Sequence, residues 1–179
     1  GAGGTTDFSF TVNRSEYKKA LEVLEGVRSR GLAAKEILGD NKIGKVSLVG
    51  IGILLAQTGK ATEALESYRK ALVIQQQLAD DNPAVTSFRD RLAGTHLNIG
   101  NLLSEIGQPA EALDALELAR TIFQELAAAN PKALGYRNNV AKCGTSIADV
   151  LFALGRIDGA REANERAITI FEGVVRSNP

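Results

Sequence analysis

Residues 99–126 read IGNLLSEIGQPAEALDALELARTIFQEL, and this stretch holds the end of one helical pattern, a glycine turn and the start of a second pattern. Before Gly107, the side chains that share one face recur at steps of three and four, at Phe88, Leu92, His96, Ile99 and Leu103. This spacing predicts a helix that ends at the glycine, with Pro83 suited to its first position. After Gln108-Pro109, a second apolar stripe predicts a helix ending near Asn130, through Ala112, Leu113, Leu116, Ala119, Ile122, Phe123 and Leu126. The stretch therefore encodes a helical hairpin.

The same pattern recurs upstream and downstream. Gly59, Gly107 and Gly155 stand 48 residues apart. Other positions keep this step: Ile51, Ile99 and Ile147; Leu55, Leu103 and Leu151; Ala64, Ala112 and Ala160; Ala71, Ala119 and Ala167; and the Asn-Pro pairs at 82–83, 130–131 and 178–179. A fixed period of this size predicts stacked hairpins, here as units 51–82, 83–130 and 131–179. Residues 40–45 fit no repeat position, so we expect two domains, 1–50 and 51–179.

Residues 51–179 resemble the tetratricopeptide repeat, in which a small residue in the first helix, a turn glycine and an Ala-bulky-Ala pattern recur. Here these positions are Gly100, Gly107, Ala112, Leu116 and Ala119, with Gly52, Gly59, Ala64, Tyr68 and Ala71 before them and Ala148, Gly155, Ala160, Asn164 and Ala167 after them. The step is longer than the roughly 34 residues typical of that family, and Asn164 replaces a bulky residue. Extended units of this kind are similar to tandem arrays in large bacterial scaffold proteins.

The resemblance implies a mainly α fold, an α-α superhelix whose first helices line a concave, partner-binding surface. Transferred position by position, the family's groove residues are Leu97, Asn101, Ser104, Glu105, Lys142, Thr145, Asp149 and Phe152. At each position, an ordinary solvated side chain is the alternative interpretation.

The first 50 residues follow a different pattern. Phe8, Phe10 and Val12 alternate as in a strand, residues 14–30 have helical spacing, and 33–38 and 43–49 are typical of two further strands. The strings TTDFSFTV (5–12), ALEVLE (20–25) and KVSLVG (45–50) resemble the aspartokinase regulatory region, which is built from ACT domains. The resemblance implies a partial ACT or ferredoxin-like β-α-β-β segment, whose exposed strand edges could pair two copies into a homodimer. It lacks the effector loop and the kinase domain, so no effector-binding or catalytic residue is transferred.

Composition and motifs exclude several classes of function. Lys plus Arg equals Asp plus Glu at 21 each, so charge supports neither nucleic-acid nor membrane binding. Gly50-Ile51-Gly52 lacks the third glycine of a dinucleotide loop, and Gly59-Lys60 lacks the rest of a phosphate loop. The lone His96 and the single Cys143 are more typical of packing than of catalysis or metal binding. We expect no cofactor, no metal and a cytoplasmic location.

The sequence thus predicts a non-enzymatic scaffold that binds a protein or peptide. The alternative is a regulatory fragment, in which the ACT-like piece senses an amino acid or dimerises. A further alternative is an artificial or misassembled fusion near residues 49–52, whose N-terminal piece has no function of its own.

Overall fold

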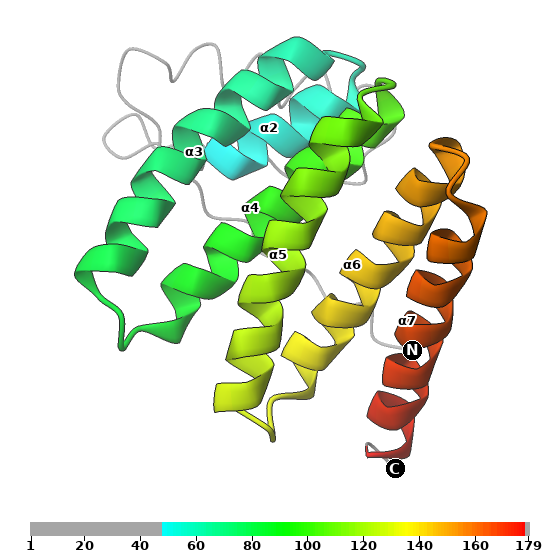
Figure 1. Cartoon of the computed structure of the whole chain (residues 1–179). Coiled ribbons are helices and arrows are strands. Elements are labelled where there is room, and N and C mark those ends of the chain that lie inside the picture. Colours follow the sequence, from blue (N-terminus) through cyan, green and yellow to red (C-terminus); the bar gives the residue numbers. More distant parts are fainter. Residues whose placement is uncertain (1–47, 178–179) are drawn as a thin grey trace, which may run out of the picture. The chain divides into compact units, whose positions relative to one another are not determined.

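The computed structural model describes residues 48–177, and all of it that is regular is helical. The helices are α2 (Leu48–Gln57), α3 (Ala61–Asp81), α4 (Thr86–Glu105), α5 (Pro109–Ala129), α6 (Leu134–Ala153) and α7 (Ile157–Arg176) (Figure 1). The chain divides into two compact units, Gly1–Lys70 and Ala71–Pro179. The predicted strands and helix of the N-terminal segment lie outside the described residues, with one exception.

That exception is a correction at the end of the predicted strand 43–49. Leu48 and Val49 are the first two residues of α2, a largely apolar helix that continues to Gln57. An unbroken apolar run does not by itself distinguish a strand from a buried helix. The repeat pattern, which we placed from residue 51 onward, therefore begins with a helix that reaches slightly further toward the N-terminus.

Within the first unit, α2 and the beginning of α3 form a close hairpin. A Cβ built on Gly52 would lie 2.5 Å from Cε1 of Tyr68, and the Tyr68 side chain is buried. The turn between the helices contains Gly59 at φ +77°, a conformation that side-chain-bearing residues avoid. Glycine at these two positions thus serves two purposes, close helix contact and a left-handed turn.

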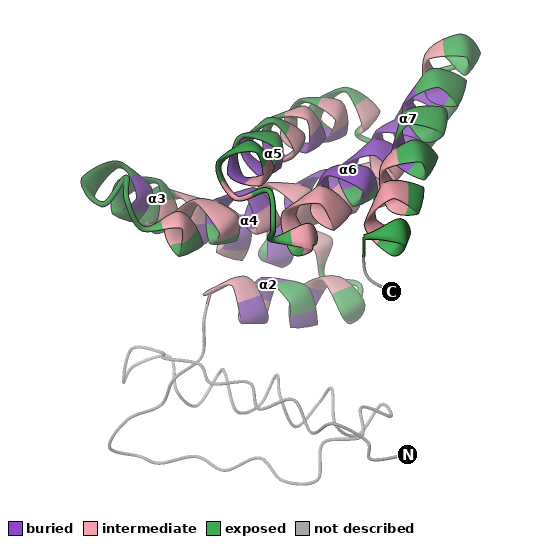
Figure 2. Cartoon of the chain, turned by 90° about the horizontal axis from the view of Figure 1, so that it is seen from below, coloured by how far each residue is buried: buried purple, intermediate pink, exposed green. Residues whose placement is uncertain are grey.

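The second unit contains the hairpins α4–α5 and α6–α7, and each helix packs beside the next along the chain (Figure 1). Their core includes Leu92 of α4, Phe123 and Leu126 of α5, and Val140 and Cys143 of α6. Buried residues lie on the sides of α4, α5 and α6 that face one another, and exposed residues cover the outer sides (Figure 2). The predicted apolar stripes are therefore the contact faces of these helices.

The turns confirm some sequence predictions and correct one. Gly107 and Gly155 have φ values of +77° and +72°, and Pro109 occupies the first turn of α5. Pro83 does not open α4, which begins at Thr86. Instead, Val85 N–H donates to the carbonyl of Asn82 at 2.9 Å, closing a turn with proline in its second position. The same bond from Ala133 to Asn130 joins α5 to α6.

The two hairpins of this unit differ in where their helices approach most closely. In α4–α5, a Cβ on Gly100 would lie 2.6 Å from Cγ of Leu116. In α6–α7, the position that corresponds to Leu116 is Asn164, which is exposed. The close approach there is one turn earlier in α6, where a Cβ on Gly144 would lie 3.1 Å from Cβ of Ala167. The departure at Asn164 is thus accommodated by a shifted contact.

Candidate partner-binding surface

The eight predicted groove residues lie on α4 and α6, the first helices of the two hairpins in the second unit. Leu97, Asn101 and Ser104 follow one another at steps of four and three, so they share a face of α4. Thr145, Asp149 and Phe152 repeat this arrangement on α6, 48 residues later. Because α4 and α6 contact each other directly, the fold brings the two sets onto neighbouring helices. We call these eight residues the inner stripe.

The two halves of the inner stripe differ in exposure. On α4, Leu97 is half-buried and packs against the core around Phe123, and Asn101 and Ser104 are also half-buried. Glu105 is exposed at the end of this helix. On α6, Lys142 and Asp149 are exposed, whereas the Thr145 hydroxyl donates to the Lys142 carbonyl at 2.8 Å. The α6 half is therefore the more accessible one.

Phe152 is the most unusual member of the inner stripe. Its side chain is 67% exposed, although it is one of the largest apolar side chains in the protein. The residues 48 and 96 positions earlier are Ser104 and Ala56, which are small, so the aromatic ring is specific to the third hairpin. An exposed aromatic beside polar and charged groups is typical of contact sites for other proteins.

Asp90 is a further residue of this face that sequence reasoning did not single out. It stands seven residues before Leu97, which is two helical turns along the same side of α4. Partial burial raises the pKa of its carboxyl group, and the nearby Arg91 cation opposes that shift. The signal that could have found it is the polar pair Asp90 and Asn138 at equivalent repeat positions.

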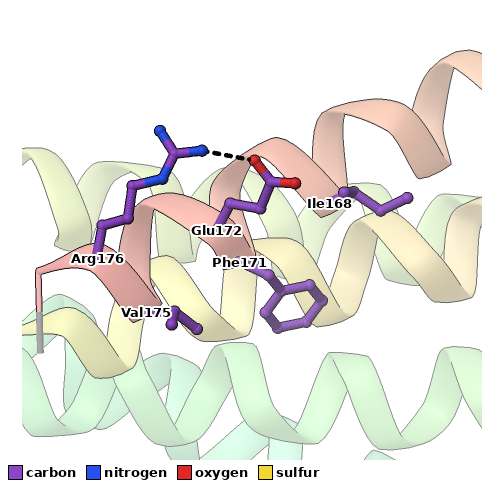
Figure 3. A pocket seen from close by; sticks show the side chains of 5 residues that line it. All are labelled: Ile168, Phe171, Glu172, Val175 and Arg176. Atoms are coloured by element: carbon purple, nitrogen blue, oxygen red, sulfur yellow. Dashed lines mark hydrogen bonds and ion pairs between the residues drawn. The ribbon is translucent and has the colours of Figure 1, made fainter. Parts of the chain in front are cut away.

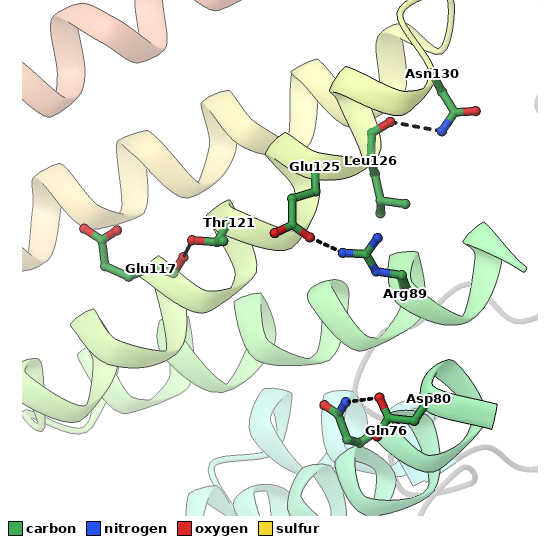
Figure 4. A network of polar contacts seen from close by, with 8 residues as sticks. All are labelled: Gln76, Asp80, Arg89, Glu117, Thr121, Glu125, Leu126 and Asn130. Carbon is green, nitrogen blue, oxygen red and sulfur yellow. Dashed lines mark hydrogen bonds and ion pairs between the residues drawn. The ribbon is translucent and has the colours of Figure 1, made fainter. Parts of the chain in front are cut away.

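Polar contacts on other faces hold the helices that carry the inner stripe. Arg89 of α4 forms an ion pair with Glu125 of α5, which ties the two helices together (Figure 4). The Asn130 side-chain amide donates to the Leu126 carbonyl at 3.0 Å and covers the end of α5. Thr121 donates to the Glu117 carbonyl, and Gln76 donates to Asp80 within α3 (Figure 4). These contacts leave the inner stripe available.

Groups that could carry out chemistry are few among residues 48–177. No cluster of three or more His, Cys, Asp or Glu side chains there could hold a metal ion. Burial lowers the pKa of His96, which is half-buried in α4. Burial also raises the pKa of the Cys143 thiol to about 12, in agreement with the predicted structural role of this residue. In the same residues, no helix has both the length and the apolar character needed to cross a bilayer.

Comparison with known proteins finds two kinds of similarity. The tetratricopeptide repeat family model matches residues 45–125, which include α2, α3 and α4 and most of α5. An aspartate kinase from Pseudomonas putida is 44% identical over 75 residues, which is 42% of this chain and 18% of that protein. An aspartokinase from Corynebacterium glutamicum is 39% identical over 66 residues, 37% of this chain and 15% of the relative.

The extent of these matches sets their weight. The chain spans less than a fifth of the length of either aspartokinase. The P. putida match is longer than the segment of about 50 residues in which the sequence resemblance was identified. Among solved structures, MamA has a TM-score of 0.31 at 17% identity, over 91% of this chain and 89% of that one. At this TM-score the structural likeness supports no inference about function.

Proposed function

We propose that this chain is a non-enzymatic scaffold that binds a protein or peptide across the inner stripe of α4 and α6. The observation that carries the proposal is Phe152, exposed to 67% on a helix face that also presents Lys142 and Asp149. The tetratricopeptide repeat match over residues 45–125 supports it, because hairpin repeats present such faces to partners. The extended 48-residue unit is part of the proposal.

The side chains of the inner stripe indicate how a ligand would be held. Phe152 offers an apolar contact that a partner can cover, and Lys142 and Asp149 offer one charge of each sign. Asn101, Ser104 and Thr145 can hydrogen-bond to the backbone of an extended peptide. A peptide with an apolar side chain flanked by polar groups fits this set better than a highly charged one.

The test begins with a random peptide library displayed on phage and selected against the whole chain. A selected peptide is then titrated against the chain by fluorescence polarisation. Burying a phenylalanine contributes about 1.5–3 kcal/mol, so Phe152→Ala should weaken binding at least about tenfold. Leu118→Ala is the matched control, since Leu118 is an apolar side chain of α5 that is also largely exposed. Equal affinities of the two variants for every selected peptide would contradict the proposal.

A second candidate function rests on the aspartokinase similarity of 44% over 75 residues. In this alternative, an ACT-like N-terminal segment binds an amino acid or pairs two copies of the chain. Calorimetric titration with lysine and with threonine tests it, together with sedimentation velocity of the free chain. A saturable heat or a stable dimer would favour the regulatory fragment. A monomer that gives no heat with either amino acid would eliminate it and leave the N-terminal piece as the passenger of a fusion.

A further inference from the structure

The outer face of α7 carries an apolar groove that is independent of the inner stripe. It has a volume of about 320 Å³ and is lined by Ile168, Phe171, Glu172, Val175 and Arg176. All five residues belong to α7, so a single helix forms the groove. Figure 3 shows the apolar side chains beside one another, with the Glu172–Arg176 ion pair, 2.9 Å long, at their border. Val175 is 71% exposed.

The preceding hairpin shows what covers the equivalent face of α5. Phe171 stands 48 residues after Phe123, and Val174 stands 48 residues after Leu126. Phe123 and Leu126 are each 1% exposed, because α6 packs over them. Phe171 and Val174 are only half-buried. The same face is thus closed on α5 and open on α7.

The face of α7 is also more apolar than its counterpart. Where α5 has Arg120 and Ala127, α7 has Ile168 and Val175, both of them exposed. A helix that had to face only water would gain nothing from these two replacements. They enlarge the surface that a further helix could cover.

We propose that this face of α7 docks one amphipathic helix of the α6 kind, the first helix of a further hairpin, which packs on α7 as α6 packs on α5. The chemistry of the occupant follows from α6, whose Tyr136, Val140 and Cys143 pack in the core with Phe123. It must therefore present apolar side chains at positions i, i+4 and i+7, small enough at the last position to let the backbones approach.

The test gives the whole chain such a helix. A second copy of residues 132–154 is appended after Pro179, so that it follows Asn178-Pro179 as the original follows Asn130-Pro131. We expect the thermal unfolding midpoint to rise by about 5 °C or more. Amide hydrogen exchange within residues 168–176 should slow at least tenfold. A control extension has glutamate at the copied Val140 and Cys143 positions and should give neither effect.

Two α7 variants of the extended chain locate the contact. Val175→Asp should abolish the gain with little effect on folding, because Val175 is largely exposed. Thr169→Asp, an exposed position on the other side of α7, should leave the gain intact. An extension that gives no slower exchange, or a control extension that works equally well, overturns the proposal. So does a dimer of the unextended chain that Val175→Asp dissociates, because the occupant is then a second copy.

Discussion

A single arginine illustrates how the repeat positions diverge at the residue scale. Arg89 pairs with Glu125 across α4 and α5, and the residues 48 positions later are Arg137 and Gly173. Arg137 lies over that glycine, since a Cβ there would be 2.8 Å from its guanidinium Nη2. The third hairpin thus keeps the cation of the pair and lacks the carboxylate.

Restoring the carboxylate should stabilise the protein. Gly173→Glu removes a glycine from a helix, which contributes up to about 1 kcal/mol, and adds an exposed ion pair worth about 0–1 kcal/mol. The flexible end of Arg137 can move to accept the new side chain. We expect urea unfolding to show a free energy higher by about 1 kcal/mol. Gly173→Ala isolates the helix effect, and a Gly173→Glu chain no more stable than Gly173→Ala would show that the pair does not form.

Cys143 provides a second residue-scale prediction, in its dependence on pH. Its thiol is fully buried, and its pKa rises from 9.0 to about 12. The unfolded chain releases this proton near pH 9 and the folded chain does not, so stability is complete below pH 9 and falls as the pH approaches 12. Between pH 8 and pH 10 the loss is about 1.4 kcal/mol.

Urea unfolding at these two pH values, compared with Cys143→Ala, isolates the contribution of the thiol from that of other groups. The variant removes the titrating group, so the stability difference between the two proteins should shrink by that amount as the pH rises. The same burial predicts slow reaction of the folded chain with a thiol reagent at pH 8. Rapid modification without unfolding would contradict the buried position.

At the scale of the elements, glycine determines how closely paired helices approach. Gly100→Ala would place a Cβ 2.6 Å from Leu116 and 3.2 Å from the backbone carbonyl of Ala112. We expect it to destabilise the chain by about 1–3 kcal/mol, although alanine favours helices. Gly94→Ala in the same helix has no atom within 4 Å and should stabilise by about 0.5–1 kcal/mol. Urea unfolding distinguishes the two, and equal effects would argue against close contact at Gly100.

The elements also show how far the sequence alone could go. The turns at Gly107 and Gly155 were predictable because a left-handed residue after a helix is nearly always glycine. The start of α4 was predicted too early, because proline suits both the first helical position and the second position of a turn. The strand through Val49 failed at its end, since a short apolar run fits either structure.

The inner stripe was predictable in position and unpredictable in exposure. Helical spacing and the family resemblance placed Leu97 and Phe152 on corresponding faces, but Leu97 packs on the core and Phe152 does not. That difference depends on which residues of later helices cover each site, which no local pattern encodes. The shifted contact at Gly144 has the same origin, because it compensates for Asn164 in a different helix.

On the scale of the whole molecule, the repeat continues past the family match. The match ends at residue 125, yet the hairpin α6–α7 follows with a turn glycine in the same conformation as the earlier two. This third hairpin contributes the most exposed part of the inner stripe and the open face of α7. We therefore place both proposed contact surfaces mainly on the part of the chain beyond the matched residues.

The most direct test of the account is nuclear magnetic resonance of the ¹⁵N-labelled whole chain, titrated with a peptide selected for binding. We predict that the largest chemical-shift changes fall in residues 97–105 and 142–152, and that the outward face of α5 around Leu118 changes little. Changes concentrated on α5, or confined to residues before Leu48, would contradict the claim that this protein binds its partner across the inner stripe.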